Sequence, residues 1–277
     1  MKLLLFADLH LDTNFDHNGP ARRKAQRETL GRIVELAFEE KADALLCAGD
    51  LYEHDRFSPD TAAFLRTAFD VDLRVYLAPG DDDWYGPQSL YQQVDWSPNV
   101  HVFTEDTLEP VDLADGITLW GGANCAPAPA KGFLDGFAVA RGGVNLALFH
   151  GPEPEDIAIT GLDHAFLGHV HTPSHAPHHT YPGNPDPLTP GETGDRGAVL
   201  CTVHEDGTVS RKTFDVSAGR ALLMPPAEPS PVPLHLGALA DERTVRGQFV
   251  RDVEASSLDL PTKARVLAMG LRALEER

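Results

Sequence analysis

The chain has 277 residues, enough for one sizeable domain with a large core and a small appendage. Its 42 acidic residues outnumber 23 basic ones and give a net charge of −19. Proteins that bind nucleic acid nonspecifically usually carry a basic footprint, so this balance argues against that class. Bound divalent cations can still reverse the sign of the charge locally.

Three cysteines, Cys47, Cys125 and Cys201, are widely separated and form no CxxC pair. We therefore expect reduced, structural cysteines in a cytoplasmic protein. The apolar start before Asp8 is too short for a signal peptide, and no later run is long enough to span a bilayer. We expect no membrane association.

The first third of the chain alternates short apolar runs with helical periodicity. The runs at 2–7, 42–48 and 73–78 are typical of buried parallel strands. Between the first two, apolar side chains recur at i, i+3, i+4, i+7 and i+8, which predicts a helix: Leu30, Ile33, Val34, Ala37 and Phe38. Ser58 and Pro59 predict the N-cap and first residue of a second helix. This β-α-β-α-β beginning indicates an α/β fold.

Further strands are predicted at 117–122, 144–149 and 164–168, and residues 197–216 form a predicted hairpin that turns at Asp206-Gly207. Around 224–233 prolines accumulate and the periodicity ends. The predicted organisation is a main domain at 1–217, a proline-rich linker at 218–233 and a mostly helical segment at 234–277.

Aspartates and histidines follow five of the predicted strands. In chain order these residues are Asp8 and His10, Asp50, Asp81, His150, and His169 with His171. Each alone has an ordinary explanation, such as a turn aspartate or a solvated histidine. However, open α/β sheets bind their ligands at the carboxyl edge, and so many acidic and imidazole groups meeting there are costly without cations. The set predicts a metal site.

Four motifs carry a family resemblance: FADLHLD (6–12), AGDLYEHDRFSPDTA (48–62), FLGHVHTP (166–173) and YPGNPDPLTPGE (181–192). In this order they resemble the calcineurin-like metallophosphoesterases, and in detail the SbcD-like DNA-repair exonuclease branch. The resemblance covers about residues 1–217. It implies a four-layer α/β/β/α sandwich of two mixed sheets flanked by helices, followed here by a short C-terminal helical segment.

The resemblance also implies two divalent metal ions, with Asp50 bridging them. One ion is held by Asp8, His10, Asp50 and His171, and the other by Asp50, Asp81, His150 and His169. Such a pair activates a hydroxide for attack on phosphorus and stabilises the attacking and leaving oxygens. Imidazole and carboxylate ligands without a thiolate suit manganese, iron or zinc better than calcium. The resemblance implies manganese as the favoured metal, with iron and zinc as alternatives.

One motif departs from the family pattern. The family reads Gly-Asn-His-Asp where this chain reads Gly80-Asp81-Asp82-Asp83. Asp81 adds a negative charge at a neutral asparagine's position, and Asp82 replaces the histidine that orients phosphate and assists the leaving group. Asp82 is therefore a catalytic position, an added metal ligand or neither, and His54 is a candidate substitute for the histidine.

Several residues outside these motifs allow two interpretations of their role. Trp84 and Tyr85 either stack on a base or pack their loop, and packing is favoured. The residues of one basic cluster form either a solvated helix face, which is favoured, or a strip that follows phosphates: Arg22, Arg23, Lys24 and Arg27. The histidines in a proline-rich loop are expected to be solvated: His175, His178 and His179.

Three functions remain open at this point. The first is a metal-dependent nuclease of the repair type, acting on single-stranded DNA or DNA ends. The second is a phosphodiesterase for small substrates such as cyclic nucleotides, which the acidic charge favours. The third is a weakly active metal-binding partner of an SbcC-like ATPase, which the change at Asp82 favours.

Overall fold

The computed structural model describes residues 1–15, 18–128, 132–151, 157–189, 191–192, 194–223, 244–259, 262–263, 266–267, 270–271 and 274. The chain divides into two compact units, Met1–Leu223 and Met224–Arg277. The proline-rich stretch predicted at 224–233 lies outside the described residues. Among the helices described, none combines the length and apolarity needed to cross a membrane.

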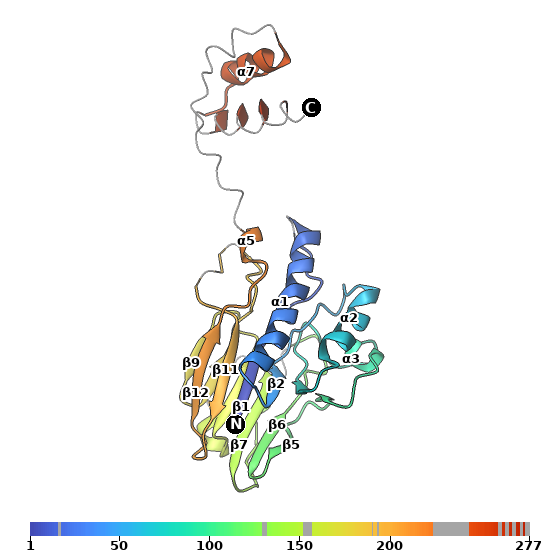
Figure 1. Cartoon of the computed structure of the whole chain (residues 1–277), viewed down its shortest axis with the longest axis vertical. Coiled ribbons are helices and arrows are strands. Elements are labelled where there is room, and N and C mark those ends of the chain that lie inside the picture. The colour runs from blue at the N-terminus through green and yellow to red at the C-terminus, as the bar shows by residue number, and fades with distance from the viewer. Residues whose placement is uncertain are drawn as a thin grey trace. The chain divides into compact units, whose positions relative to one another are not determined.

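In its described part, the first unit holds two mixed sheets of six strands each (Figure 1). The first sheet has the order β12-β11-β1-β2-β3-β4. Its members are β1 (Lys2–Phe6), β2 (Ala44–Cys47), β3 (Arg74–Leu77), β4 (Val100–Val102), β11 (Ala198–Val203) and β12 (Val209–Phe214). Strands β1 to β4 run parallel, and β11 pairs antiparallel with both β1 and β12. The three predicted N-terminal strands and the predicted hairpin are confirmed.

The second sheet has the order β5-β6-β7-β8-β10-β9. Its members are β5 (Glu109–Ala114), β6 (Ile117–Gly121), β7 (Val144–His150), β8 (His164–Gly168), β9 (Ser174–Ala176) and β10 (His179–Tyr181). Strands β6, β7 and β8 lie where the sequence predicts them. Strands β4, β5, β9 and β10 were not predicted, because three of them have only three residues and β5 is largely exposed.

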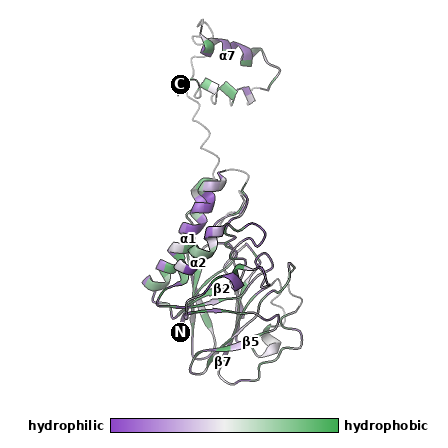
Figure 2. Cartoon of the chain, turned by 90° about the vertical axis from the view of Figure 1, so that its right-hand side faces the viewer, coloured by the Kyte–Doolittle hydropathy of each residue, from purple (hydrophilic) through white to green (hydrophobic). Residues whose placement is uncertain are grey.

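Alternation along β1 explains the layered packing. Leu4 and Phe6 face one apolar cluster beneath the helices, while Leu3 and Leu5 belong to a second cluster between the two sheets. The first sheet is covered by α1 (Gly19–Glu39), α2 (Pro59–Phe69) and α3 (Leu90–Gln93). Figure 2 shows hydrophilic residues along parts of α1, in keeping with a helix that buries one face only.

The outer face of the second sheet carries a third apolar cluster. Residues Phe133 and Phe137 and the short helix α4 (Ile157–Thr160) pack there against strand residues such as Phe149 and Leu167. The two mixed sheets flanked by helical layers confirm the predicted sandwich.

Two local expectations need correction. Ser58 stands at the N-cap of α2, but its hydroxyl bonds to the side chains of Asp12, Asp60 and Thr61 and not to a backbone amide of the helix. Cys125 is exposed, unlike the buried Cys47 and Cys201, because it follows β6 in an irregular segment and is not a core residue.

The first unit ends with α5 (Arg220–Leu223). In the second unit, α7 (Val245–Ala255) begins with a side-chain cap, in which the Thr244 hydroxyl oxygen accepts from the Gly247 amide at 3.1 Å. Val250 and Val253 of this helix pack against Leu267 and Leu271. The described part of the second unit therefore has a small apolar cluster of its own.

Candidate metal centre

The strand ends of both sheets bring the predicted ligands together. Asp8 and His10 follow β1, Asp50 follows β2 and Asp81 follows β3 in the first sheet, while His150 ends β7 and His169 and His171 follow β8 in the second sheet. Their side chains form overlapping groups in which the potential ligand atoms lie within 4.8 Å of one another. The centre is therefore built across the edge that the two sheets share.

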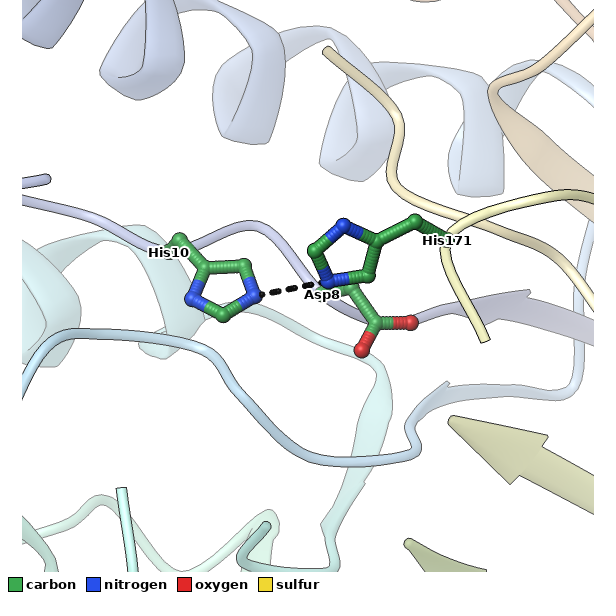
Figure 3. A group of neighbouring side chains, drawn as sticks. All are labelled: Asp8, His10 and His171. Atoms are coloured by element: carbon green, nitrogen blue, oxygen red, sulfur yellow. Dashed lines mark hydrogen bonds between the residues drawn. The ribbon is translucent and has the colours of Figure 1, made fainter. Parts of the chain in front are cut away.

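The first group consists of Asp8, His10 and His171 (Figure 3). The Nε2 atoms of His10 and His171 face each other at 3.3 Å, and the carboxylate of Asp8 lies beside them. Asp8 and His10 are buried, and His171 is partly exposed. Two imidazole nitrogens and a carboxylate that converge on one point form a donor set typical of sites for first-row transition metals.

The second group consists of Asp81, His150 and His169. The Oδ1 atom of Asp81 lies 2.9 Å from His150 Nε2 and 3.3 Å from His169 Nδ1. His150 is fully buried, and its Nδ1 bonds to the carbonyl oxygen of Ala48 at 2.8 Å. That bond orients the ring so that its Nε2 atom lies among the potential ligand atoms of the group.

Asp50 lies between the two groups. Its Oδ2 atom is 3.7 Å from His10 Nε2 in the first group and 3.2 Å from His150 Nε2 in the second. Asp8, Asp50 and His150 also form a potential ligand group of their own. Asp50 is therefore within reach of both groups.

Several of these residues have left-handed backbone conformations, which are uncommon outside glycine. The φ angles are 53° for Asp8, 50° for His10, 50° for Asp50 and 89° for His169. Aspartate and histidine tolerate this region better than most residues, yet it still costs free energy. The chain therefore turns sharply after β1, β2 and β8, where these side chains lie.

Glycines permit the close approach of these turns. Gly49 has a φ of 89°, and a Cβ atom there would lie 2.5 Å from His150 Nδ1 and 2.8 Å from the Gly80 nitrogen. A Cβ at Gly80 would overlap the carboxylate of Asp50, and one at Gly168 would overlap the carbonyl of Ala48. Glycine is therefore required where the two sheets meet.

Two glutamates that were not predicted as site residues support the histidines. Glu53 Oε1 lies 3.1 Å from His10 Nδ1, and Glu192 Oε1 lies 3.5 Å from His171 Nδ1. In both cases the carboxylate faces the ring nitrogen opposite the one that points into the centre, an arrangement that orients metal-binding histidines. Both glutamates lie in the motifs that carry the family resemblance, at 48–62 and 181–192, and these motifs are the signal that could have found them.

The electrostatics of the centre suit bound cations. Burial alone would lower the pKa of His10, but the Glu53 hydrogen bond and the charges of Asp50 and Asp8 outweigh it and raise this pKa to about 9. Burial also raises the pKa of Asp8, whose Oδ2 atom is buried with no hydrogen-bond partner among the described residues. A carboxylate oxygen without a donor, beside imidazole nitrogens, fits metal ligation.

The three consecutive aspartates have different surroundings. Asp81 belongs to the second group, and its hydrogen bonds from His150 and His169 hold its pKa well below the usual range. The Asp82 side chain is 57% exposed, with Oδ2 3.7 Å from His10 Nδ1, while its backbone amide donates to Asp50 Oδ1 at 2.9 Å. Asp82 thus lies at the rim of the first group.

Asp83 is fully buried and ties the strand ends together. Its carboxylate accepts from the amides of Gly80, Asp50 and Leu51 and from the hydroxyl of Tyr91. Burial and the charge of Asp50 raise its pKa to about 7. Asp83 therefore has a positioning role, since it fixes the turn that carries Asp50.

The ring of His54 contacts an aromatic side chain. Its ring stacks on Trp84 with 3.6 Å between ring centroids and an interplanar angle of 21°, and burial lowers its pKa. The favoured reading of Trp84 as a packing residue agrees with this contact. The ring of His54 belongs to none of the ligand groups found among the described residues.

The pattern of the calcineurin-like phosphoesterases matches residues 1–173. The chain belongs to this family. Its main domain is therefore that of a metal-dependent phosphoester hydrolase, and the donor set described above supplies candidate metal ligands.

Two curated relatives and one solved structure are similar to the chain. An uncharacterized metallophosphoesterase, YhaO of Bacillus subtilis, is 26% identical over 230 residues, which are 71% of this chain and 56% of that protein. The DNA double-strand break repair protein Mre11 of Methanopyrus kandleri is 27% identical over 274 residues, 80% of this chain and 58% of that protein. The crystal structure of TT1561 of Thermus thermophilus aligns with a TM-score of 0.50 and 18% identity, over 76% of this chain and 98% of that one, and shares the fold. The chain thus spans little more than half the length of the curated relatives.

Proposed function

We propose that the chain is a dinuclear-metal-dependent phosphodiester hydrolase that acts on DNA, as a nuclease of the repair type. The position of Asp50 between the two ligand groups is the observation that carries this proposal. One group without a bridge would fit a single ion. Two groups that share a carboxylate fit the paired cations used for in-line displacement at phosphorus.

In this proposal the first ion is held by Asp8, His10, Asp50 and His171, and the second by Asp50, Asp81, His150 and His169. When bound, such cations neutralise charge on the phosphate oxygens and supply a nucleophile at neutral pH. Glu53 and Glu192 keep the rings of His10 and His171 oriented. Manganese remains the proposed metal, with iron and zinc as alternatives.

The choice of DNA as substrate is supported by similarity to a repair protein and by the motifs at 48–62 and 181–192. The net charge of −19 favours the alternative, a phosphodiesterase for small substrates. The aspartate at position 82 favours a weakly active partner of an SbcC-like ATPase. A cytoplasmic location is part of the proposal, in keeping with the free cysteines.

Substitution of Asp50 tests the two-metal assignment. Asp50→Ala removes the shared ligand, so it is expected to lower metal occupancy at both positions and to abolish hydrolysis. Elemental analysis of the purified variant measures this directly, with Asp55→Ala, an exposed aspartate on the same loop, as the control. Two metals per chain in the Asp50→Ala variant would contradict the assignment.

Substrate profiling separates the three functions. The nuclease predicts Mn²⁺-dependent turnover of single-stranded DNA with salt-dependent affinity. The small-substrate enzyme predicts turnover of cyclic nucleotides and bis-p-nitrophenyl phosphate without DNA cleavage. Failure on every substrate at full metal occupancy supports the weakly active partner.

A further inference from the structure

A basic cavity lies beside the candidate metal centre. Its volume is about 640 Å³, and its lining residues are Asp12, Asn14, Pro20, Arg23, Lys24, Arg27, Arg56, Ser58 and Asp60. Four of these nine carry a positive charge, in a chain whose acidic residues outnumber its basic ones by 42 to 23. The cavity therefore has a charge opposite to that of the molecule.

The acidic residues of this cavity are already paired. Asp60 Oδ2 lies 2.6 Å from Arg27 Nη1, and Asp12 accepts from the amide of Ser58 at 2.8 Å and from the hydroxyl of Thr61. Arg27 also lies 3.7 Å from Asp12, so its charge is largely balanced within the wall. The charges of Asp12 and Asp60 are therefore balanced mainly by Arg27 and not by the other three cations of the cavity.

Arg23, Lys24 and Arg56 are the cations left over. Lys24 has one exposed i,i+4 contact with Glu28 at 3.5 Å, with the lysine side chain 79% exposed, and such pairs contribute little. Arg56 is exposed and Arg23 half-buried, and neither forms an ion pair within the part of the chain that the structure describes. Three cations lining one cavity are available to a bound anion.

Arg22 belongs to the same basic cluster in the sequence but does not line the cavity. Its guanidinium lies 3.5 Å from the centre of the Phe15 ring and donates to the carbonyl oxygens of Pro187 and Leu188. The helix periodicity turns Arg22 inward and leaves Arg23, Lys24 and Arg27 to line the cavity. Arg22 therefore has a structural role, while the other three basic residues of the cluster line the cavity.

The cavity is continuous with the loops that carry the metal ligands. Asp12 and Asn14 follow His10 on the loop after β1, and Arg56 follows Glu53 on the loop after β2. The amide of Arg56 donates to the carbonyl of Glu53, whose side chain holds His10. A phosphodiester chain with one phosphate at the centre would therefore meet Arg56 on the loop after β2, and Arg23 and Lys24 of α1 line the same cavity.

We propose that the cavity is a subsite for the sugar-phosphate backbone of a single-stranded nucleic acid, which contacts Arg23, Lys24 and Arg56 through phosphates beside the one hydrolysed. This proposal rests on the proposed nuclease function and deepens it, since it gives the substrate more than one phosphate. Guanidinium and ammonium groups on a groove wall are typical of backbone contacts that carry no base specificity. The subsite also offsets the repulsion expected from the acidic surface.

The test compares two double variants of the full chain. Arg23→Ala/Lys24→Ala removes two cavity cations, and Arg66→Ala/Lys212→Ala removes two exposed cations elsewhere, so that the net charge is matched. The dissociation constant of a fluorescein-labelled oligothymidylate is measured by fluorescence anisotropy in EDTA over a range of salt concentrations. Steady-state rates on the same oligomer and on bis-p-nitrophenyl phosphate are measured in Mn²⁺.

The cavity variant is expected to bind the oligomer about tenfold more weakly. The slope of log K against log salt is expected to flatten by about 1.4, from about 0.7 for each lost contact with a single strand. Its rate on bis-p-nitrophenyl phosphate, which has one phosphate, is expected to equal that of the unchanged chain. The control variant is expected to change none of these quantities to a similar extent.

Different outcomes overturn different proposals. Equal oligomer affinity in the cavity variant and the unchanged chain, or no oligomer binding by the unchanged chain, overturns the subsite. An equal loss in both double variants also overturns it, because the effect would then reflect net charge alone. Oligomer binding that depends on Arg23 and Lys24 but leads to no cleavage in Mn²⁺ overturns the nuclease function and leaves the subsite standing.

Discussion

At the scale of single residues, Asp82 lies at the edge of the candidate metal centre, with its side chain 57% exposed. Its backbone amide holds Asp50, while its side chain reaches the rim of the first ligand group near His10. Every residue except proline has this backbone N–H, so the side chain can change without loss of that hydrogen bond. A substitution at position 82 therefore tests the side chain while the backbone hydrogen bond to Asp50 is retained.

We predict that Asp82→His increases the rate on DNA. The change removes a negative charge beside the phosphate and supplies a group whose ordinary pKa is near neutrality, and such acid–base assistance is typically worth about 10²–10⁴-fold. A nitrophenyl diester has a good leaving group that needs no proton, so its rate is expected to change much less. The measurement is kcat on both substrates at saturating Mn²⁺.

A decrease on both substrates together with weaker metal affinity would contradict this prediction. It would show that the Asp82 carboxylate serves as an additional metal ligand, in line with its grouping with His10 and Asp50.

His164 gives a prediction for the pH dependence of stability. It is fully buried, with Nδ1 3.1 Å from the Pro177 carbonyl and Nε2 2.9 Å from the Thr180 hydroxyl. Burial, aided by the charge of Arg211, lowers its pKa from 6.5 to about 3. Between these two values the unfolded chain binds more protons, so the stability that neutral His164 contributes is present above pH 6.5 and is lost as the pH falls towards 3.

The matching experiment is thermal unfolding of the unchanged chain and of His164→Asn across this pH range. The unchanged chain is expected to melt higher at neutral pH, and the difference is expected to shrink on acidification. The exposed His178→Asn serves as control. A difference in melting temperature that is constant with pH would show that His164 does not titrate in this way.

At the scale of secondary structure elements, the end of β2 depends on glycine. We predict that Gly49→Ala costs about 2 kcal/mol or more in the free energy of unfolding, because its φ of 89° disfavours a side chain and its Cβ would meet His150. Gly31→Ala in α1 is the control: nothing lies within 4 Å of its Cβ, and alanine in a helix is expected to stabilise by about 0.5–1 kcal/mol. Chemical denaturation of both variants measures the two effects, and equal stabilities would contradict the account.

The elements also show how far the sequence alone is informative. Buried parallel strands such as β1 and β2 give continuous apolar runs, so their ends and the polar residues that follow them are predictable. Strands β4 and β9 have three residues and too little pattern to detect. The pairing of His171 with Glu192 depends on a loop conformation, which no local periodicity encodes.

At the scale of the whole molecule, the predicted ligands and both sheets lie in the first unit. We predict that a fragment of residues 1–223 folds cooperatively and hydrolyses bis-p-nitrophenyl phosphate with the kcat/KM of the full chain. The apolar clusters of the first unit contain no described residue beyond 223, and the second unit has its own cluster. A fragment that fails to melt cooperatively, or that loses its metal, would contradict this division.

The centre draws its residues from Asp8 to His171, and no short segment of the chain contains more than two of them. A cation that needs all of them can bind only after both sheets have formed. Binding to the native state alone stabilises it by mass action, by about 2.7 kcal/mol when the free ion is at a hundred times its dissociation constant. The lifetime of the folded protein in a cell would therefore follow the supply of free metal, even when no phosphodiester is being hydrolysed.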